Sequence, residues 1–253
     1  MKMAKTFIVA NWKMNKTTGQ ALEYARGLKA ALLQNPVSAV VVIAPPFTGM
    51  RALAEELKDS AVCLAAQNMH PAARGAFTGE ISGEMVVDAG CRYCIIGHSE
   101  RRQLFGEDNH LINAKITAAL NYGVMPIFCI GETLASRNAG ETFSVLSKQL
   151  KEGLNKIPAN DIGKIAIAYE PVWAIGTGLT ATPGQVHEAH SFIRNLLSEI
   201  YGEKATADLS IIYGGSVTAA NISSLMAEKE INGVLVGSAS LDLASFLAIV
   251  NFK

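Results

Sequence analysis

Eight short runs of apolar residues, rich in Val and Ile, recur along the whole chain with helical patterns between them. Each run is almost continuously apolar, as expected of parallel strands that are covered on both faces. The runs lie at 6–10, 39–44, 61–65, 94–97, 124–130, 165–169, 209–213 and 233–237. This repeated alternation of strand and helix predicts an α/β fold built on a parallel sheet.

Two of the segments between the runs carry clear helix starts. Thr182, Pro183 and Gln185 supply an N-cap, a proline at the first helical position and the glutamine of a capping box. Thr17 and Gln20 form the same box ahead of a stripe of apolar residues at helical spacing. We therefore expect a helix to begin at each place.

The chain shows no Pro/Ser-rich linker and no change of composition between its halves. Its 253 residues, 49% of them hydrophobic, are enough to bury one large core. These features favour a single domain over residues 1–253, folded as a closed (β/α)8 barrel of eight parallel strands surrounded by helices. An open doubly wound sheet is the structural alternative. In either fold, functional groups are expected just after the carboxyl ends of the strands.

The charges exclude two broad classes of function. Lys and Arg total 22, Asp and Glu total 22, and no basic block stands out. The chain therefore lacks the electrostatic footprint of a protein that binds nucleic acid or an anionic membrane. The apolar run near the N-terminus is too short for a signal peptide, and no stretch approaches the length of a membrane span. We expect a soluble, cytoplasmic protein.

The four cysteines are Cys63, Cys91, Cys94 and Cys129. Cys91 and Cys94 have the spacing of a redox pair, but no second pair or nearby His cluster completes a metal site. We interpret the cysteines as buried free thiols.

Polar side chains follow the first and fourth runs. Asn11 and Lys13 project to the same side because side chains alternate along a strand. His98 precedes Ser99, a predicted N-cap, so the imidazole would face helix N-terminal amides, remain neutral and donate a hydrogen bond to a carbonyl oxygen. The plainer alternatives are a solvated surface charge for Lys13 and a satisfied backbone group for His98.

The sixth run ends at Glu170. A carboxylate after so apolar a strand is costly unless it is paired or used, and a desolvated glutamate is a competent base toward a proton on carbon. The alternative is an ion pair with Lys13 or with an arginine. The next segment, 172–178, is apolar and contains Trp173 and Ile175, which we expect to be exposed and to form a lid. Simple packing on the barrel rim is the alternative.

Small residues follow the seventh and eighth runs, at 214–216 and 237–240. Glycine and serine let backbone N–H groups approach an anion at the start of a helix. The loops after these two strands are also where barrel enzymes often bind phosphate. The sequence therefore predicts a phosphate site between the two loops.

Six segments together resemble the signature blocks of the triosephosphate isomerase family, in its order and at its spacing. They are 11–15, 75–80, 96–102, 129–133, 169–178 and 213–217. The resemblance implies a TIM barrel that interconverts dihydroxyacetone phosphate and D-glyceraldehyde 3-phosphate, a step of glycolysis and gluconeogenesis. It implies no metal, nucleotide or redox cofactor, because substrate and product differ only in the position of hydrogens.

The resemblance also implies a role for each matching residue. Glu170 would move the proton between carbons, His98 would serve the two oxygens, and Lys13 and Asn11 would stabilise the enediolate. Glu100 and Cys129 look like supporting residues. A lid over 171–178 would exclude water from the intermediate. The phosphate would be held by backbone N–H groups of Gly176, Ser216, Gly237 and Ser238.

The long connection 67–82 resembles the family's dimer loop, which implies a homodimer in which Phe77 and Thr78 dock near Met14 of a second copy. The chain departs from the family at two positions: Leu179 replaces a usual lysine after the lid, and Ser238 replaces a usual glycine.

Two further functions remain as alternatives. A Schiff-base aldolase on the same barrel would need a desolvated lysine at a strand end, and Lys13 is the candidate, since Lys164 begins its strand. A non-catalytic phosphate-binding module would be expected to lack Glu170 or His98, and both are present.

Overall fold

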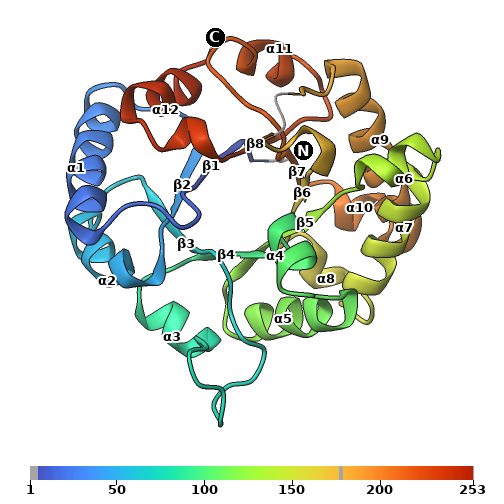
Figure 1. Cartoon of the computed structure of the whole chain (residues 1–253), viewed down its shortest axis with the longest axis horizontal. Coiled ribbons are helices and arrows are strands. Elements are labelled where there is room, and N and C mark those ends of the chain that lie inside the picture. Colours follow the sequence, from blue (N-terminus) through green and yellow to red (C-terminus); the bar gives the residue numbers. More distant parts are fainter. Residues whose placement is uncertain (1–4, 177–178, 253) are drawn as a thin grey trace.

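Eight parallel strands close into a ring in the computed structural model, which describes residues 5–176 and 179–252 (Figure 1). Each strand pairs with the next, and β1 pairs with β8. The strands are β1 (Phe7–Asn11), β2 (Val40–Ala44), β3 (Cys63–Ala66), β4 (Tyr93–Ile96), β5 (Met125–Ile130), β6 (Ala166–Tyr169), β7 (Ser210–Tyr213) and β8 (Gly233–Val236). The (β/α)8 barrel is confirmed, and the open doubly wound sheet is wrong.

All eight apolar runs contain a strand. The largest shift of a boundary is at β3, which begins at 63 where 61 was expected.

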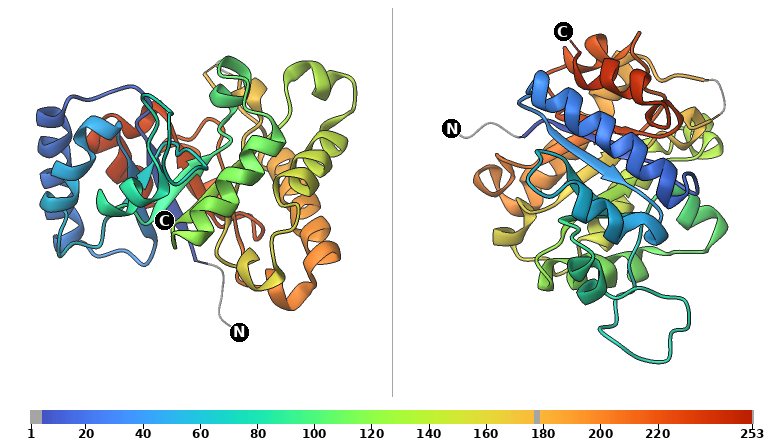
Figure 2. Two further views of the ribbon diagram at one scale, coloured as in Figure 1. Left: turned by 90° about the horizontal axis from the view of Figure 1, so that it is seen from below. Right: turned by 90° about the vertical axis from the view of Figure 1, so that its left-hand side faces the viewer.

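Helices surround the ring on its outer side (Figure 1; Figure 2). They are α1 (Thr18–Gln34), α2 (Phe47–Glu56), α3 (Gly83–Asp88), α4 (Ser99–Leu104), α5 (Asn109–Asn121), α6 (Leu134–Asn138), α7 (Thr142–Gly153), α8 (Ala159–Ile162), α9 (Pro183–Tyr201), α10 (Glu203–Thr206), α11 (Ile222–Met226) and α12 (Leu243–Val250), with 3-10 turns η1 (Val172–Ala174) and η2 (Ser238–Ser240). No described helix is both long enough and apolar enough to span a membrane.

Both predicted capping boxes are present. The Thr17 N–H donates to Oε1 of Gln20 at 2.9 Å ahead of α1, and the Thr182 N–H donates to Oε1 of Gln185 at 3.0 Å ahead of α9.

The alternation of side chains divides the core into two layers. In β1, Phe7 and Val9 belong to the cluster inside the ring, whereas Ile8 and Ala10 pack outward against the helices. Asn11 continues the inward series at the carboxyl end of the strand. The inner cluster is Phe7, Val9, Val42, Ala44, Ala65, Tyr93, Ile95, Ile127, Cys129, Ala166, Ala168, Ile212 and Leu235. The barrel is therefore filled below its mouth, and polar side chains begin where this packing ends.

All four cysteines are free thiols, and three of them are buried while Cys63 is half-buried. Burial raises the pKa of Cys91 to about 12 and raises the pKa of Cys94 as well. Thiols that resist ionisation are poor redox nucleophiles. The interpretation of free thiols is confirmed over that of a redox pair.

One connection leaves the ring. The loop 67–82 between β3 and α3 projects away from the barrel (Figure 1; Figure 2). Its base is closed by a 2.8 Å hydrogen bond from the His70 N–H to the Ile81 carbonyl. The ring of Phe77 packs at a tilt against the ring of His70, with ring centroids 4.0 Å apart. Phe77 nevertheless keeps 45% of its surface exposed.

Candidate active site

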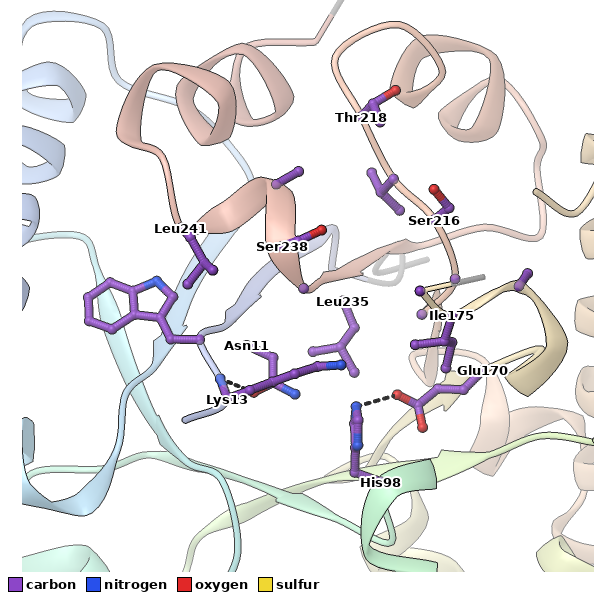
Figure 3. A pocket seen from close by; sticks show the side chains of 18 of the residues that line it. Asn11, Lys13, His98, Glu170, Ile175, Ser216, Thr218, Leu235, Ser238 and Leu241 are labelled. Carbon is purple, nitrogen blue, oxygen red and sulfur yellow. Dashed lines mark hydrogen bonds and ion pairs between the residues drawn. The ribbon is translucent and has the colours of Figure 1, made fainter. Parts of the chain in front are cut away.

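A cavity of about 420 Å³ opens at the carboxyl ends of the strands (Figure 3). Loops after β1, β4, β6, β7 and β8 all contribute to its wall. The structure brings together eight of the ten predicted site residues on its lining: Asn11, Lys13, His98, Glu170, Gly176, Ser216, Gly237 and Ser238. The remaining two, Glu100 and Cys129, lie just behind it, next to Lys13 and Glu170 respectively.

Glu170 continues the inward series of β6, after Ala166 and Ala168, and its surface is only 2% exposed. Two glycines leave room for it. A Cβ atom on Gly131 would lie 1.7 Å from the Glu170 carbonyl oxygen, and one on Gly214 would lie 2.8 Å from its Cγ. A side chain at Gly131 would displace the backbone of Glu170, and one at Gly214 would displace its side chain.

The carboxylate of Glu170 has two partners at the end of β4. Its Oε1 lies 3.0 Å from Nε2 of His98 (Figure 3). Its Oε2 accepts a 3.0 Å hydrogen bond from the backbone N–H of Ser99. The alternative pairing of Glu170 with Lys13 or an arginine is wrong. The nearest titratable partner is instead an imidazole.

His98, rather than Ser99, is the N-cap of α4, so the predicted cap is wrong by one residue. Gly97 has φ of 73°, which breaks the strand alternation and turns the next side chain toward the mouth. Nδ1 of His98 then accepts the N–H of Glu100 at 3.3 Å. A ring with a lone pair on Nδ1 carries its proton on Nε2, facing Glu170.

The pKa of His98 is set by burial and by two carboxylates. Burial lowers it, but the carboxylate of Glu170 and, less strongly, that of Glu100 raise it, and the net direction is upward. The sequence argument considered only the helix amides and did not include a carboxylate 3.0 Å from Nε2. The helix amides, which we expected to keep the ring neutral, are therefore opposed by a carboxylate that raises the pKa of His98.

Lys13 lies in a left-handed conformation with φ of 50°. Its Nζ donates to Oε1 of Glu100 at 2.6 Å, and its N–H donates to Oδ1 of Asn11 at 3.1 Å. Its carbonyl accepts a 2.8 Å hydrogen bond from Nε2 of Gln67. Lys13 is half-buried and reaches into the cavity with Asn11 (Figure 3), so the reading as a solvated surface charge is wrong.

Small residues form the wall opposite Glu170 and His98. Ser216 and Ser238 stand on facing loops above the cavity floor (Figure 3). Ser238 is not among the described non-glycine residues with positive φ, so a serine is accommodated there without backbone strain. Leu179, the other departure from the family, is 51% exposed.

The first part of the predicted lid packs onto the rim. Trp173 is only 9% exposed, so the expectation that it is exposed is wrong. Its Nε1 donates to Oε1 of Glu132 at 2.8 Å, and the guanidinium of Arg137 lies 4.5 Å from its ring centroid. Ile175 is half-buried and lines the cavity. Residues 177 and 178, which end the predicted lid, lie outside the described residues.

Two residues that matter to the site were not singled out from the sequence. Glu132, fully buried after β5, accepts from Tyr169 Oη at 3.2 Å and pairs with Arg137 at 3.2 Å while holding Trp173. A search for polar residues after every predicted strand, including the fifth, would have found Glu132. Leu235 forms the cavity floor, and the inward alternation of β8 would have found it.

Within 5–176 and 179–252, no group of three or more His, Cys, Asp or Glu side chains could hold a metal ion. What the cavity does offer is a buried carboxylate, an imidazole beside it, an ammonium and an amide, facing loops of small residues. Such a set can move a proton, stabilise a developing oxyanion and hold an anionic group.

Comparison with known proteins gives one consistent result. The family model described as triosephosphate isomerase matches residues 6–253. A triosephosphate isomerase of Syntrophotalea carbinolica is 48% identical over 251 residues, covering 99% of each chain. Those of Chloroflexus aurantiacus and Moorella thermoacetica are each 48% identical, over 246 and 250 residues, covering 97% and 99% of this chain and 98% and 99% of their own.

Proposed function

This chain belongs to the triosephosphate isomerase family and carries that family's isomerase activity, and from this premise we propose that Glu170 and His98 interconvert dihydroxyacetone phosphate and D-glyceraldehyde 3-phosphate. The observation that carries the proposal is the 3.0 Å contact of these two side chains at the cavity.

Glu170 is the base. It removes a proton from the carbon next to the carbonyl, and the electron pair left behind forms the carbon–carbon double bond of an enediolate. The same carboxyl group then returns the proton to the neighbouring carbon. Its burial at 2% exposure keeps the transferred proton from water.

His98 serves the oxygens. With its proton on Nε2, it donates to the carbonyl oxygen where negative charge develops and moves a proton between the two oxygens of the intermediate. The Nδ1 lone pair that accepts the Glu100 N–H supports this tautomer. Lys13, held by Glu100, and the amide of Asn11 stabilise the enediolate from the other side.

The phosphate lies between the facing small-residue loops, held by backbone N–H groups of Gly176, Ser216, Gly237 and Ser238. Closure of the lid, of which the structure describes 171–176, excludes the water that would let the enediolate expel phosphate. The direct contact of Trp173 with Glu132 supports a lid whose first part has a defined resting place on the rim.

A coupled isomerase assay, run from each triose phosphate, tests the function. Wild-type turnover that persists in both Glu170→Asp and His98→Gln would remove their assigned roles. Borohydride reduction with substrate tests the aldolase alternative, and a stable adduct on Lys13 would favour it. The 2.6 Å contact of the Lys13 ammonium with Glu100 supports a charged lysine rather than a Schiff-base amine.

The protein acts as a homodimer through the loop 67–82. Phe77, at 45% exposure, and Met14, at 95%, are large apolar side chains exposed on the single chain, as expected of residues that a partner covers. Free thiols at all four cysteines support a reducing compartment such as the cytoplasm.

A further inference from the structure

Lys16 joins the loop after β1 to the loop after β8. Its Nζ donates a 2.8 Å hydrogen bond to the carbonyl oxygen of Leu241, across 225 positions of sequence. Lys16 has φ of 71°, a conformation that disfavours any residue with a Cβ atom. Within the described part of the chain, no other hydrogen bond joins segment 12–17 to segment 237–242.

The ammonium group of Lys16 is also held by two aromatic rings. It lies 5.3 Å from the ring centroid of Trp12 and 4.7 Å from that of Tyr24, and these buried rings pack edge to face. Burial lowers the pKa of Lys16, although Asp242 and Glu23 raise it. The side chain is therefore drawn into a partly desolvated position, where a cation–π contact is stronger than on an open surface.

The far end of this bridge is fixed relative to the phosphate loop. The Leu241 N–H donates to the Ser238 carbonyl at 3.0 Å, and the Ser240 N–H donates to the Gly237 carbonyl at 2.9 Å. A hydrogen bond that fixes the position of Leu241 therefore also restrains the turn that contains Gly237 and Ser238. Lys16 itself lies three residues after Lys13. Its hydrogen bond to Leu241 therefore connects the loop that carries the Lys13 ammonium to the loop that carries the proposed phosphate donors Gly237 and Ser238.

We propose that Lys16 is a positioning residue that sets the phosphate-binding turn 237–241 against the loop of Lys13, so that both meet one bound substrate. This role rests on the proposed function of those two loops. Lys16 itself touches neither substrate nor reacting atoms. Without it, β1 and β8 remain paired below the mouth, at Ala10 and Val236, but their loops lose this connection above it.

The test compares variants of Lys16 with a matched control. Lys16→Met keeps an apolar stem and loses the ammonium, and Lys16→Gln is a shorter polar alternative should the methionine variant not fold. Lys16→Arg keeps the charge and the ring contacts. Lys29→Met is the control, because Lys29 makes the same kind of bond, to the Glu56 carbonyl at 2.8 Å, on the outer helix layer.

Steady-state kinetics are measured together with competitive inhibition by inorganic phosphate and by glycerol 3-phosphate. We expect Lys16→Met and Lys16→Gln to raise KM and both inhibition constants about fivefold, as the loss of roughly 1 kcal/mol of hydrogen bond and cation–π contact implies, with a much smaller change in kcat. Lys16→Arg should restore values close to wild type. Lys29→Met should lower the melting temperature without changing KM.

Equal KM values in Lys16→Met, Lys16→Gln and Lys29→Met would overturn the proposal, and so would a fall in kcat with unchanged KM. Calorimetric titration with inorganic phosphate gives the same comparison without any turnover. A wild-type protein that binds phosphate but does not isomerise the triose phosphates would contradict the proposed function. The calorimetric comparison of the Lys16 variants would still test the positioning role.

Discussion

Nε2 of His98 lies 3.0 Å from Oε1 of Glu170, and both side chains are more than nine-tenths buried. The two groups to which we assign the proton transfers are therefore partners of each other in this structure. The proposed mechanism requires a substrate to replace this contact, because in it Glu170 reaches a carbon atom and His98 an oxygen atom. The hydrogen bond from the Ser99 N–H to Oε2 of Glu170 must then also break or change its geometry.

Shortening the base should separate chemistry from binding. Glu170→Asp withdraws the carboxylate by about 1 Å, and a misplacement of that size lowers kcat by about 100-fold. KM should change little, because the phosphate donors are untouched. The coupled assay measures both constants, and circular dichroism confirms the fold. A variant with kcat within a few-fold of wild type would show that Glu170 is not the base.

The raised pKa of His98 should depend on Glu170. In Glu170→Gln the carboxylate is lost and burial remains, so the pKa of His98 should fall below that of the wild type. Titration of the His98 ring by NMR measures both values, and an unchanged midpoint would contradict this electrostatic account. In the wild type, the contact of His98 with Glu170 stabilises the fold fully below the unfolded pKa of His, about 6.5, and this contribution is lost as pH rises through the raised pKa.

Lid closure should be visible in tryptophan fluorescence. Only two tryptophans are present, and Trp12 is fully buried while Trp173 bonds to Glu132. Saturation with glycerol 3-phosphate should shift the emission of the wild type and of Trp12→Phe, because closure moves the Trp173 indole relative to Glu132 and Arg137. Trp173→Phe should show no such shift. An unchanged emission in all three proteins would argue against movement of this segment.

His190 should make the fold sensitive to acid. It is fully buried, its Nδ1 lies 3.0 Å from the Glu230 carbonyl oxygen, and burial lowers its pKa to about 4. The unfolded chain takes up this proton near pH 6.5, so the free energy of unfolding should fall by up to ~3 kcal/mol between pH 6.5 and 4. Urea denaturation at several pH values should show a shallower fall in His190→Gln than in the exposed control His110→Gln. Equal slopes would exclude His190 as the source.

Charge placed on the projecting loop should prevent dimerisation. Phe77→Asp would bury an unpaired carboxylate in the proposed interface, at a penalty of several kcal/mol, so the variant should sediment as a monomer. Leu33→Asp is the matched control, since Leu33 is 82% exposed on α1, and it should remain dimeric. A wild type that sediments as a monomer with full activity at low concentration would refute the homodimer itself.

The fold and the polar residues at the strand ends follow from local rules, whereas Glu100 and Cys129 were expected only from the family resemblance. Apolar runs reveal strands, and residues just after a strand must lie at one mouth, which is why Asn11, Lys13 and Glu170 were placed correctly. A parallel barrel leaves little freedom once its strands are known.

Pairings between distant segments were harder to predict. The sequence around His98 shows a helix start, but the upward direction of its pKa comes from Glu170, which is 72 positions away along the chain. The local sequence around Trp173 is typical of an exposed lid. Its burial is explained by contacts with Glu132 and Arg137, which follow another strand. The bridge from Lys16 to Leu241 has no local signature at all.

The closed order of strands has a consequence for any attempt to divide this protein. Asn11, Lys13 and His98 come from β1 and β4, whereas Glu170 and the phosphate loops come from β6 to β8. A cut in the connection between β4 and β5 would give two fragments, neither holding a complete set of reacting groups. Activity recovered on mixing them would report that the two halves had reassembled into the ring.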